Sequence, residues 1–448
     1  MKNNKIGLFS LTMIVIGLVI GMGIFRTSKD VAQASLSPTI FFASWIVGGI
    51  VAFCGAMTYA EIGSRYPVTG GYYKIFSYAY HPSIAFAINC VILISNAASL
   101  SGVALIGSEY ITPILFSSEA SDTLKSFVAM AAILLFYGVN LLGLKISTQA
   151  QNVLMLIKIG MLLIIISSLF FPQLYVPASE AVAVNAPLSW TAIILSFGVA
   201  LKATSFTYGG YQQTINFGEE IERPQQNIPK GIFIGILVII LLYLTVSIAY
   251  INIIGFEQLK TTSGIASIVV EKMFGVTGRH IASVLLFIAV LAYVNVLLLS
   301  NPRVMYAMSM DGILPASFKK KDEKKDVLTV SLTVFTAICI VVLFFADTFD
   351  KILSFTIFLD SLGMATSAAT IFVLRKRTRH LEGTGIFSMK LYPLLPAFFV
   401  LNYLFVGTVI AITFPAYAVI GTVVFLFFLL IYFLTQRGKA EKSTHGTI

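Results

Sequence analysis

A single lysine stands inside an otherwise apolar stretch of this chain. Lys158 lies in the segment 154–161, about ten residues into a predicted membrane span. A charged side chain within a membrane is costly, so it is a functional hypothesis by default. We expect its ammonium to occupy the place of a coupling cation, bonding the first helix and the segment 295–300. A desolvated lysine could also exchange a proton, and a lysine that only extends to the interface is the alternative.

Two other apolar segments are interrupted by glycine. The first is 17–25 (GLVIGMGIF) and the second is 206–211 (FTYGGY), nearly two hundred residues later. Glycine allows a helix to unwind and expose its backbone, which is tolerated at membrane depth only beside protein or a water-filled cavity. Close packing of helices is the alternative explanation of either cluster alone. A matched pair of interruptions indicates a transporter's substrate site.

The two interruptions expose backbone groups of opposite charge. The N–H groups of residues 22–24 begin an outer half-helix and attract an anion, whereas the carbonyls of Phe206, Thr207 and Gly209 attract a cation. This pair suits a zwitterionic α-amino acid, and the apolar and aromatic surroundings without a fixed charge favour a neutral one. The predicted substrate-binding residues are Ile20, Gly21, Met22, Gly23, Ile24, Phe206, Thr207, Tyr208, Gly209, Gly210 and Tyr211.

Charged residues flank these segments and are candidates for gates. Glu61 and Arg65 are four residues apart, on one helix face near the predicted inner surface. Glu219 and Glu220 follow the second interruption, before a proline-containing turn. We expect both sets to form a cytoplasmic gate, with a solvated face as the alternative. Lys202, one turn before the second interruption, could line the entry vestibule or extend outward to the interface.

The composition is that of a polytopic membrane protein. The chain has 448 residues, of which 57% are hydrophobic and 11% are charged, and its mean hydropathy is +0.90. Apolar runs long enough to cross a bilayer predict an all-α protein of about twelve spans. The predicted spans are 7–33, 39–64, 82–113, 124–143, 148–171, 188–218, 231–254, 281–309, 328–346, 351–375, 390–411 and 413–435.

The position of the two interrupted helices predicts an internal repeat. Each interrupted span begins a unit of five spans, 7–171 and 188–375, and five is an odd number, so equal units must insert in opposite orientations. Two further spans, about 390–435, would be appended. The whole chain, 1–448, is then one transmembrane domain.

The net charge of +10 orients the chain and indicates no nucleic-acid partner. Most of its 30 basic residues fall on the side of the N-terminus when twelve spans are assumed. Positive charge marks the cytoplasmic side, so both termini are expected there, in a bacterial inner membrane. Cys54, Cys90 and Cys339 lie in apolar stretches as packing residues.

The sequence contains no arrangement that predicts an enzyme. The four histidines lie at loops or ends, away from any cluster with metal-ligand spacing, and no phosphate-binding loop of the ATPase type occurs. We therefore expect no metal and no cofactor. The lipid bilayer and a small-molecule substrate are the expected partners.

Several of these motifs together resemble one known family. The chain is similar to the amino acid–polyamine–organocation superfamily, most of all its L-type amino acid transporter branch. The resemblance rests on GMGIF at 21–25, FTYGGY at 206–211, the glutamates at 219–220 with NIP at 227–229, YAEIG at 59–63, and Arg303 with DGILP at 311–315. It covers about residues 5–440.

The resemblance implies a LeuT-type fold of 5+5 inverted repeats with discontinuous helices 1 and 6. It also implies sodium-independent amino acid transport by alternating access, by exchange or proton coupling, with Phe206 as a lid and Lys158 in place of sodium. Tyr211, Gln212, Thr207 and Arg26 depart from the family pattern, and Lys202 is also unusual, so an acidic or polar substrate is an alternative to a neutral one. A polyamine antiporter, a non-transporting sensor and an ion channel are the alternatives. No external cysteine suits a link to an accessory heavy chain, so none is expected.

Overall fold

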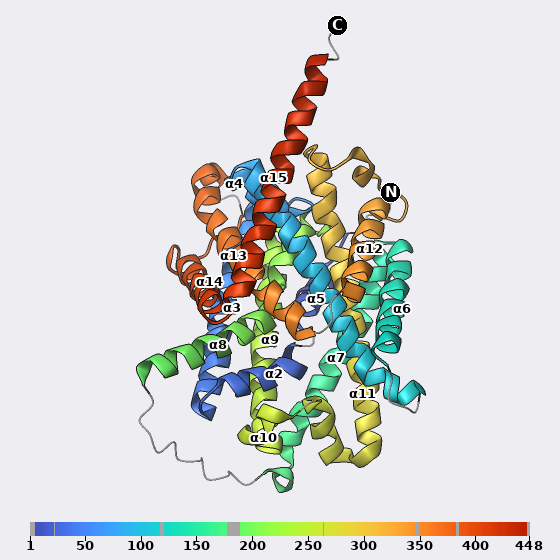
Figure 1. Cartoon of the computed structure of the whole chain (residues 1–448), viewed down its shortest axis with the longest axis vertical. Helices are drawn as coiled ribbons and strands as arrows, with labels where there is room; N and C mark the ends of the chain where they lie inside the picture. Colours follow the sequence, from blue (N-terminus) through green and yellow to red (C-terminus); the bar gives the residue numbers. More distant parts are fainter. Residues whose placement is uncertain are drawn as a thin grey trace.

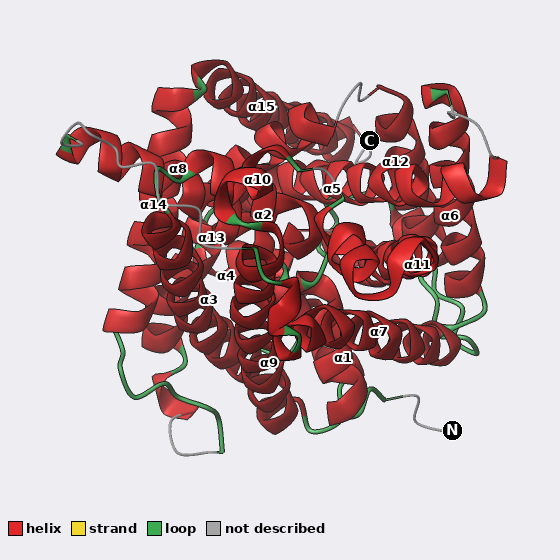
Figure 2. Cartoon of the chain, turned by 90° about the horizontal axis from the view of Figure 1, so that it is seen from below, coloured by secondary structure: helices red, strands yellow, loops and turns green. Residues whose placement is uncertain are grey.

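The structure is a computed structural model of the chain. It describes residues 5–21, 23–116, 121–176, 189–262, 264–345, 349–381 and 385–445, the side chains of 345–357 and 436–445 excepted. These ranges hold α-helices, short 3₁₀ turns and isolated bridges, and no strand (Figures 1 and 2). The α-helices are α1 (Leu8–Val19), α2 (Gly23–Ala34), α3 (Pro38–Arg65), α4 (Gly71–Ala79), α5 (Pro82–Phe116), α6 (Asp122–Leu141), α7 (Leu144–Ser167), α8 (Trp190–Tyr208), α9 (Pro224–Ile254), α10 (Phe256–Thr261), α11 (Ile265–Met310), α12 (Thr329–Phe345), α13 (Phe349–Arg377), α14 (Leu394–Thr413) and α15 (Pro415–His445).

The expected polytopic, all-helical fold is confirmed. Within the described residues, eleven helical segments are long and apolar enough to cross a membrane, and the shorter apolar helix 329–344 supplies a twelfth. The last two spans separate where the sequence places a turn, since α14 ends at Thr413 and α15 begins at Pro415. α11 is longer than its predicted span 281–309 because it includes an outer piece that meets the rest at Gly275, which has a φ of +70°.

Local signals explain where the first long helices begin and end. The hydroxyl of Ser37 accepts a hydrogen bond from the N–H of Ile40, and Pro38 occupies the first turn of α3, where no N–H partner is needed. α3 ends at Arg65, two residues before Pro67. Ser121 and Ser189 cap α6 and α8 in the same way as Ser37 caps α3.

The first and sixth spans are each discontinuous, as the glycine clusters predict. α1 ends at Val19 and α2 begins at Gly23, so a single span contains two helices. α8 ends at Tyr208 and continues after Gly209 and Gly210 as the 3₁₀ helix η3 (Tyr211–Asn216). The backbone is therefore irregular at the two positions where a membrane protein can accommodate it only against protein or water.

Corresponding spans of the two five-helix units pack against each other. α3, the second span, lies along α9, the seventh, and α5, the third, lies along α11, the eighth; α2 likewise packs on α8. α7, the fifth span, packs on α11, the eighth, and α13, the tenth, packs on α5, the third. In both pairs, the last span of one unit packs on the third span of the other unit. A two-fold axis in the membrane plane predicts these pairs, although the boundaries 7–171 and 188–375 stay a prediction.

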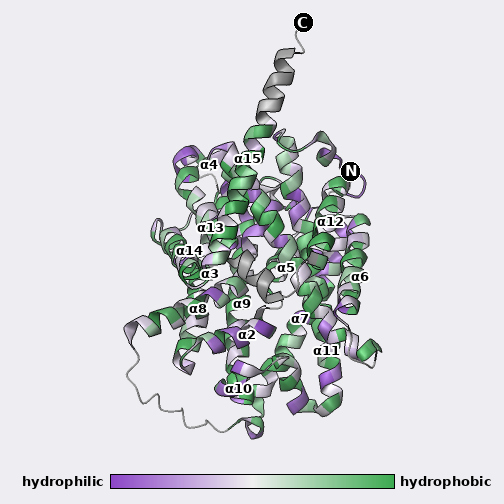
Figure 3. Ribbon diagram, viewed as in Figure 1, coloured by the Kyte–Doolittle hydropathy of each residue, from purple (hydrophilic) through white to green (hydrophobic). Residues whose placement is uncertain are grey.

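Apolar surface covers the flanks of the helix bundle. Green residues dominate its sides and purple ones gather toward its two ends and on α2 (Figure 3). In the span Pro415–Thr435, only 6% of the most apolar window is buried within the chain. An apolar helix with so little protein around it matches a lipid environment. α4 and the end of α15 lie at one end of the bundle, and α2 and α10 lie toward the other (Figure 1).

Candidate functional site

The two discontinuities meet in the middle of the bundle. A Cβ atom added at Gly210 would lie 2.0 Å from the carbonyl oxygen of Leu18, and one added at Gly23 would lie 2.7 Å from Cγ2 of Thr207. Both distances are shorter than any real contact. At Gly210 the neighbour is backbone, so only glycine allows the two chains to approach this closely, whereas at Gly23 the neighbour is the Thr207 side chain. Gly210 also has a φ of +119°, which disfavours other residues. Each break thus contains a glycine at a position that lies against the other break.

Helix ends of opposite polarity face this meeting point. α2 begins at Gly23, and the N–H groups of its first turn have no partner within the helix, so they form a positive end. α8 ends at Tyr208 with carbonyl groups that form a negative end. The carbonyl of Phe206 accepts the N–H of Gly209 at 3.1 Å and retains a second lone pair.

A cavity of about 800 Å³, including the space that opens to solvent, adjoins both breaks. Six of the predicted substrate-binding residues line it: Gly21, Gly23, Phe206, Thr207, Gly209 and Gly210. Its other lining residues are Leu18, Val19, Asn96, Ser99, Val103, Ser205, Gln212, Gln213, Tyr293, Asp360, Ser361, Met364, Tyr403 and Val406. The breaks, α5, α11, α13 and α14 therefore line one common space.

Four other predicted substrate-binding residues, Ile20, Ile24, Tyr208 and Tyr211, do not line this cavity. Tyr208 points toward α3, where its hydroxyl donates to the carbonyl of Trp45 at 3.3 Å. Tyr211 packs edge-on against Tyr59 at 6.0 Å between ring centroids. Ile20 and Ile24 are fully buried and do not line the cavity. Met22 lies outside the described residues.

Lys158 reaches the first break from α7. Its side chain is fully buried, and Nζ donates to the carbonyl oxygen of Ile20 at 2.5 Å. A cation at the carbonyl end of α1 is favoured by the helix dipole as well as by the hydrogen bond. The second expected contact, with residues 295–300, is not among the hydrogen bonds that the described residues make. Instead, Asn295 bonds to Gln151 at 2.9 Å and to Asn140 at 2.9 Å.

The residues that α11 and α13 bring to the cavity were not predicted from the sequence. The Tyr293 ring would contact a Cβ atom at Gly21 at 3.2 Å, and its hydroxyl bonds to Ser99 at 2.8 Å. Asp360 accepts a hydrogen bond from Ser95 at 2.8 Å. A signal for Asp360 was present, since it is an acid within a predicted span, like the lysine at 158. The expectation of a wall without fixed charge was therefore wrong.

Glu61 is the centre of an ion network at the end where α4 lies. Its carboxylate accepts Nε of Arg65 at 2.7 Å and two nitrogens of Arg375 at 2.6 and 2.8 Å. It also accepts the N–H of Met389 at 2.9 Å, while Arg65 donates to Thr378 Oγ1 at 3.0 Å. Glu61 and Arg65 have fully buried side chains. One carboxylate thus joins α3, α13 and the segment before α14.

A second ion pair joins the sixth span to α11 at the same end. Arg303 donates to Glu220 from two nitrogens, at 2.6 Å and 2.9 Å, and its guanidinium lies 4.4 Å from the Phe217 ring centroid. Burial raises the pKa of Glu220, and the charge of Arg303 opposes that shift. Glu219 accepts Thr69 Oγ1 at 3.0 Å. Lys74 and Asp311 also pair here.

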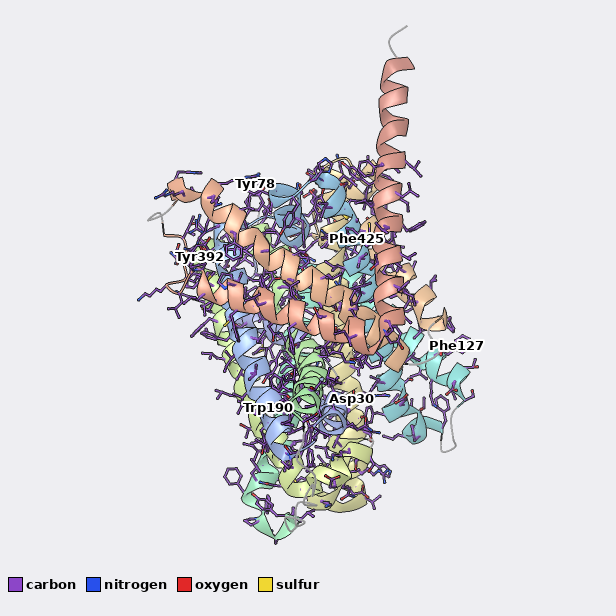
Figure 4. The ribbon with its side chains drawn as sticks, turned by 60° about the vertical axis from the view of Figure 1, so that its left-hand side comes forward. Asp30, Tyr78, Phe127, Trp190, Tyr392 and Phe425 are labelled. Carbon is purple, nitrogen blue, oxygen red and sulfur yellow. The ribbon has the colours of Figure 1, made fainter. Side chains whose placement is uncertain are left out.

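Glycine contacts show how tightly this end is packed. A Cβ atom at Gly71 would lie 2.3 Å from the carbonyl oxygen of Ile215, and one at Gly218 would lie 2.4 Å from the N–H nitrogen of Val68. The turn after α3 is therefore in backbone contact with the segment after the second break. In Figure 4, Tyr78 and Tyr392 mark this end, and Asp30 and Trp190 lie toward the opposite one.

Lys202 lies on α8, between the second break and that opposite end. Its Nζ lies 4.6 Å from the centroid of the Phe414 ring, and Asp30 is close enough to act on its charge. The pair Arg26–Glu109, at 3.5 Å, joins α2 to α5.

Among the residues that the structure describes, no group of three or more His, Cys, Asp or Glu side chains could hold a metal ion. The three cysteines are free, with Cys54 and Cys339 buried.

The comparisons with known proteins agree with this geometry. The profile of the amino acid permease family matches residues 6–435. The chain is 26% identical to the serine/threonine exchanger SteT of Bacillus subtilis, covering 90% of each chain, and 27% identical to the branched-chain amino acid permease BcaP of the same organism, covering 98% of this chain and 94% of that one. It is 25% identical to the Asc-type amino acid transporter 1 of Mus musculus over 96% of this chain and 81% of the mouse protein. A profile match over nearly the whole chain, on a polytopic helical fold with two interrupted spans at one cavity, shows that this protein belongs to the amino acid permease family.

Proposed function

We propose that this protein exchanges amino acids across the membrane by alternating access, without sodium. Amino acid transport in general follows from the family. The exchange mechanism and the roles of individual residues are our proposal. The observation that carries it is the contact between the two breaks, which places a positive and a negative helix end beside one cavity.

The backbone of the cavity is suited to the two charges that all α-amino acids share. The first-turn N–H groups of α2, beginning at Gly23, would bind the carboxylate, and the last carbonyls of α8, including that of Thr207, would bind the ammonium. Phe206 lines the same space and would cover the bound substrate. Because these contacts use backbone groups, they would not depend on the substrate's side chain.

Lys158 would act as a fixed cation at the position that a sodium ion could otherwise occupy. Its ammonium holds the carbonyl of Ile20, which is the last residue before the first break. A cation that belongs to the protein stabilises the break whether or not an ion is bound. Transport would then need no sodium gradient.

The ion networks of Glu61 and Glu220 would close the cavity toward the predicted cytoplasm. At the end where α4 lies, Glu61 joins α3 of the first five-helix unit to α13 of the second, and Glu220 joins two segments of the second unit. For the cavity to open toward that end, these contacts must break. Lys202, beside Asp30 and Phe414, would line the opposite entrance.

Radiolabelled amino acid uptake into proteoliposomes tests this proposal. The vesicles are loaded with a mixture of unlabelled amino acids or left empty, and sodium is omitted on both sides. Uptake that requires internal amino acids supports exchange. Equal uptake into empty vesicles contradicts exchange, and its stimulation by an inward pH gradient would favour proton coupling.

Binding without any flux would replace the transporter by a sensor. Binding is measured on the purified protein as a rise in thermal stability with each amino acid, since a ligand that binds only the folded state stabilises it. Protein-free liposomes are the control for leakage. The relatives named as exchanger and permease favour transport over sensing.

A further inference from the structure

A carboxylate faces the cavity from α13. Asp360 is partly buried, lines the cavity, and accepts a hydrogen bond from the hydroxyl of Ser95 at 2.8 Å. Among the lining residues it is the one Asp, Glu, Lys, Arg or His. No ion pair of Asp360 occurs within the described part of the chain. A carboxylate at membrane depth without a basic partner is costly unless a cation reaches it.

Resting on the proposed function, we propose that Asp360 binds the positively charged side chain of the substrate, which is then a cationic amino acid carrying an ammonium or a guanidinium. The site would recognise the α-amino and α-carboxylate groups through the two breaks and the side-chain cation through α13.

A path of contacts connects the first break with this carboxylate. The Tyr293 ring lies against Gly21, and its hydroxyl bonds to Ser99 on α5 at 2.8 Å. Ser95, which holds Asp360, is one turn from Ser99, or about 6 Å along the helix at 1.5 Å per residue. A substrate bound at the break would therefore approach Asp360 with its side chain, past the Tyr293 ring.

Gln213 brings a further hydrogen-bond acceptor to the cavity. The Oε1 atom of Gln213 is buried and has no hydrogen-bond partner in the described residues, while its Nε2 donates to Asn96 at 3.1 Å. Oε1 and the Asp360 carboxylate are both acceptors. An ammonium offers three donors and a guanidinium five, with no acceptor, so either matches this pair better than a hydroxyl or an alkyl group.

Aromatic rings complete the environment of a cation. Tyr293 and Tyr403 both line the cavity, and both lie close enough to Asp360 for its charge to act on them. Ring faces attract cations, and guanidinium groups stack on them. The carboxylate, the amide oxygen and the rings together form a site for positive charge. A substrate with an uncharged side chain would leave the Asp360 carboxylate without a cation.

Competition between matched amino acids tests this inference. Labelled exchange by proteoliposomes is inhibited with lysine or norleucine, and with arginine or citrulline, which have similar shapes but differ in charge. We expect the cationic member of each pair to inhibit at the lower concentration. In Asp360→Asn, the inhibition constant of the cationic member, divided by that of the neutral member, should rise by about 100-fold. This factor corresponds to the usual cost of removing one partner of a buried charge pair.

Asp122→Asn is the matched control, because Asp122 is an exposed aspartate at the start of α6, away from the cavity, and should leave the ratio unchanged. If Asp360→Asn fails to fold, the competition measured with the wild-type protein still tests the inference. Exchange of neutral amino acids that lysine and arginine do not inhibit would overturn this inference and leave the proposed function intact. If Asp360→Asn loses only the effect of a pH gradient on exchange, the carboxylate binds a proton and not the substrate. If the wild-type protein exchanges no amino acid at all, the proposed function itself is overturned.

Discussion

Lys158 shows how much one side chain depends on its surroundings. The ammonium is fully buried and its recorded hydrogen bond goes to the carbonyl of Ile20, at the end of α1. In water this contact would be weak, but in a medium of low dielectric constant a hydrogen bond to a charged group contributes more. In the proposed function, this lysine would hold the break in a conformation that otherwise requires a bound ion.

Replacing this lysine should impair transport more than folding. We expect Lys158→Ala to reduce the exchange rate about 10- to 100-fold, because a hydrogen bond to a charged group contributes about 1.5–3 kcal/mol. The measurement is exchange per mole of protein in proteoliposomes, together with the yield of monodisperse protein. Lys145→Ala, an exposed lysine at the start of α7, is the control. Wild-type exchange in Lys158→Ala would exclude the assigned role.

At the scale of elements, the two interrupted spans act as one unit. Each break contributes the glycine that the other needs for close approach, as at Gly210 beside Leu18 and at Gly23 beside Thr207. The helix ends of α2 and α8 owe their positions to these contacts. A change at one break should therefore alter binding groups that belong to the other.

Gly210→Ala tests this coupling. The methyl group would meet the carbonyl oxygen of Leu18 at 2.0 Å, and a φ of +119° adds about 1–3 kcal/mol of strain for a non-glycine residue. We expect the rise in melting temperature that substrate causes in the wild type to disappear. Gly160→Ala, on α7 with no atom within 4 Å of the added group, should keep it. Unchanged affinity in Gly210→Ala would refute the unwound site.

At the scale of the whole molecule, we propose that the ion networks determine which end of the cavity is closed. Glu61 on α3 pairs with Arg65 on the same helix and with Arg375 on α13, and Glu220 pairs with Arg303 on α11. A buried pair contributes little net stability, but removing one partner leaves an uncompensated charge. These networks are therefore best explained as contacts that hold one conformation relative to another.

Glu61→Gln should open this end of the molecule. Two arginines would lose their carboxylate, at a cost of about 3–5 kcal/mol to the closed arrangement. In a background without the three native cysteines, a cysteine at Ser64, which is buried beside Gln225 and Phe387, should react faster with a thiol reagent in Glu61→Gln. Glu323→Gln, an exposed acid, is the control. Equal labelling rates in the two variants would remove Glu61 from the gate.

The sequence by itself determined the helical membrane fold and the two breaks. Hydropathy depends only on the local composition of a segment, and two glycine clusters at matched positions of the two halves indicate interrupted helices. Twelve spans and the pairs Gly21–Gly23 and Gly209–Gly210 could therefore be predicted. Lys158 was recognisable for a similar reason, since an isolated charge in an apolar run needs no neighbour to be noticed.

Only the tertiary structure decided which side chains line the cavity. Tyr208 and Tyr211 adjoin the second break in sequence, but helix geometry turns them toward α3, away from the cavity. Tyr293 and Asp360 come from helices far along the chain and reach the cavity because α11 and α13 both pack on α5. Which face of a membrane helix meets a cavity depends on its partners, because lipid and protein neighbours are both apolar and leave little pattern in the sequence.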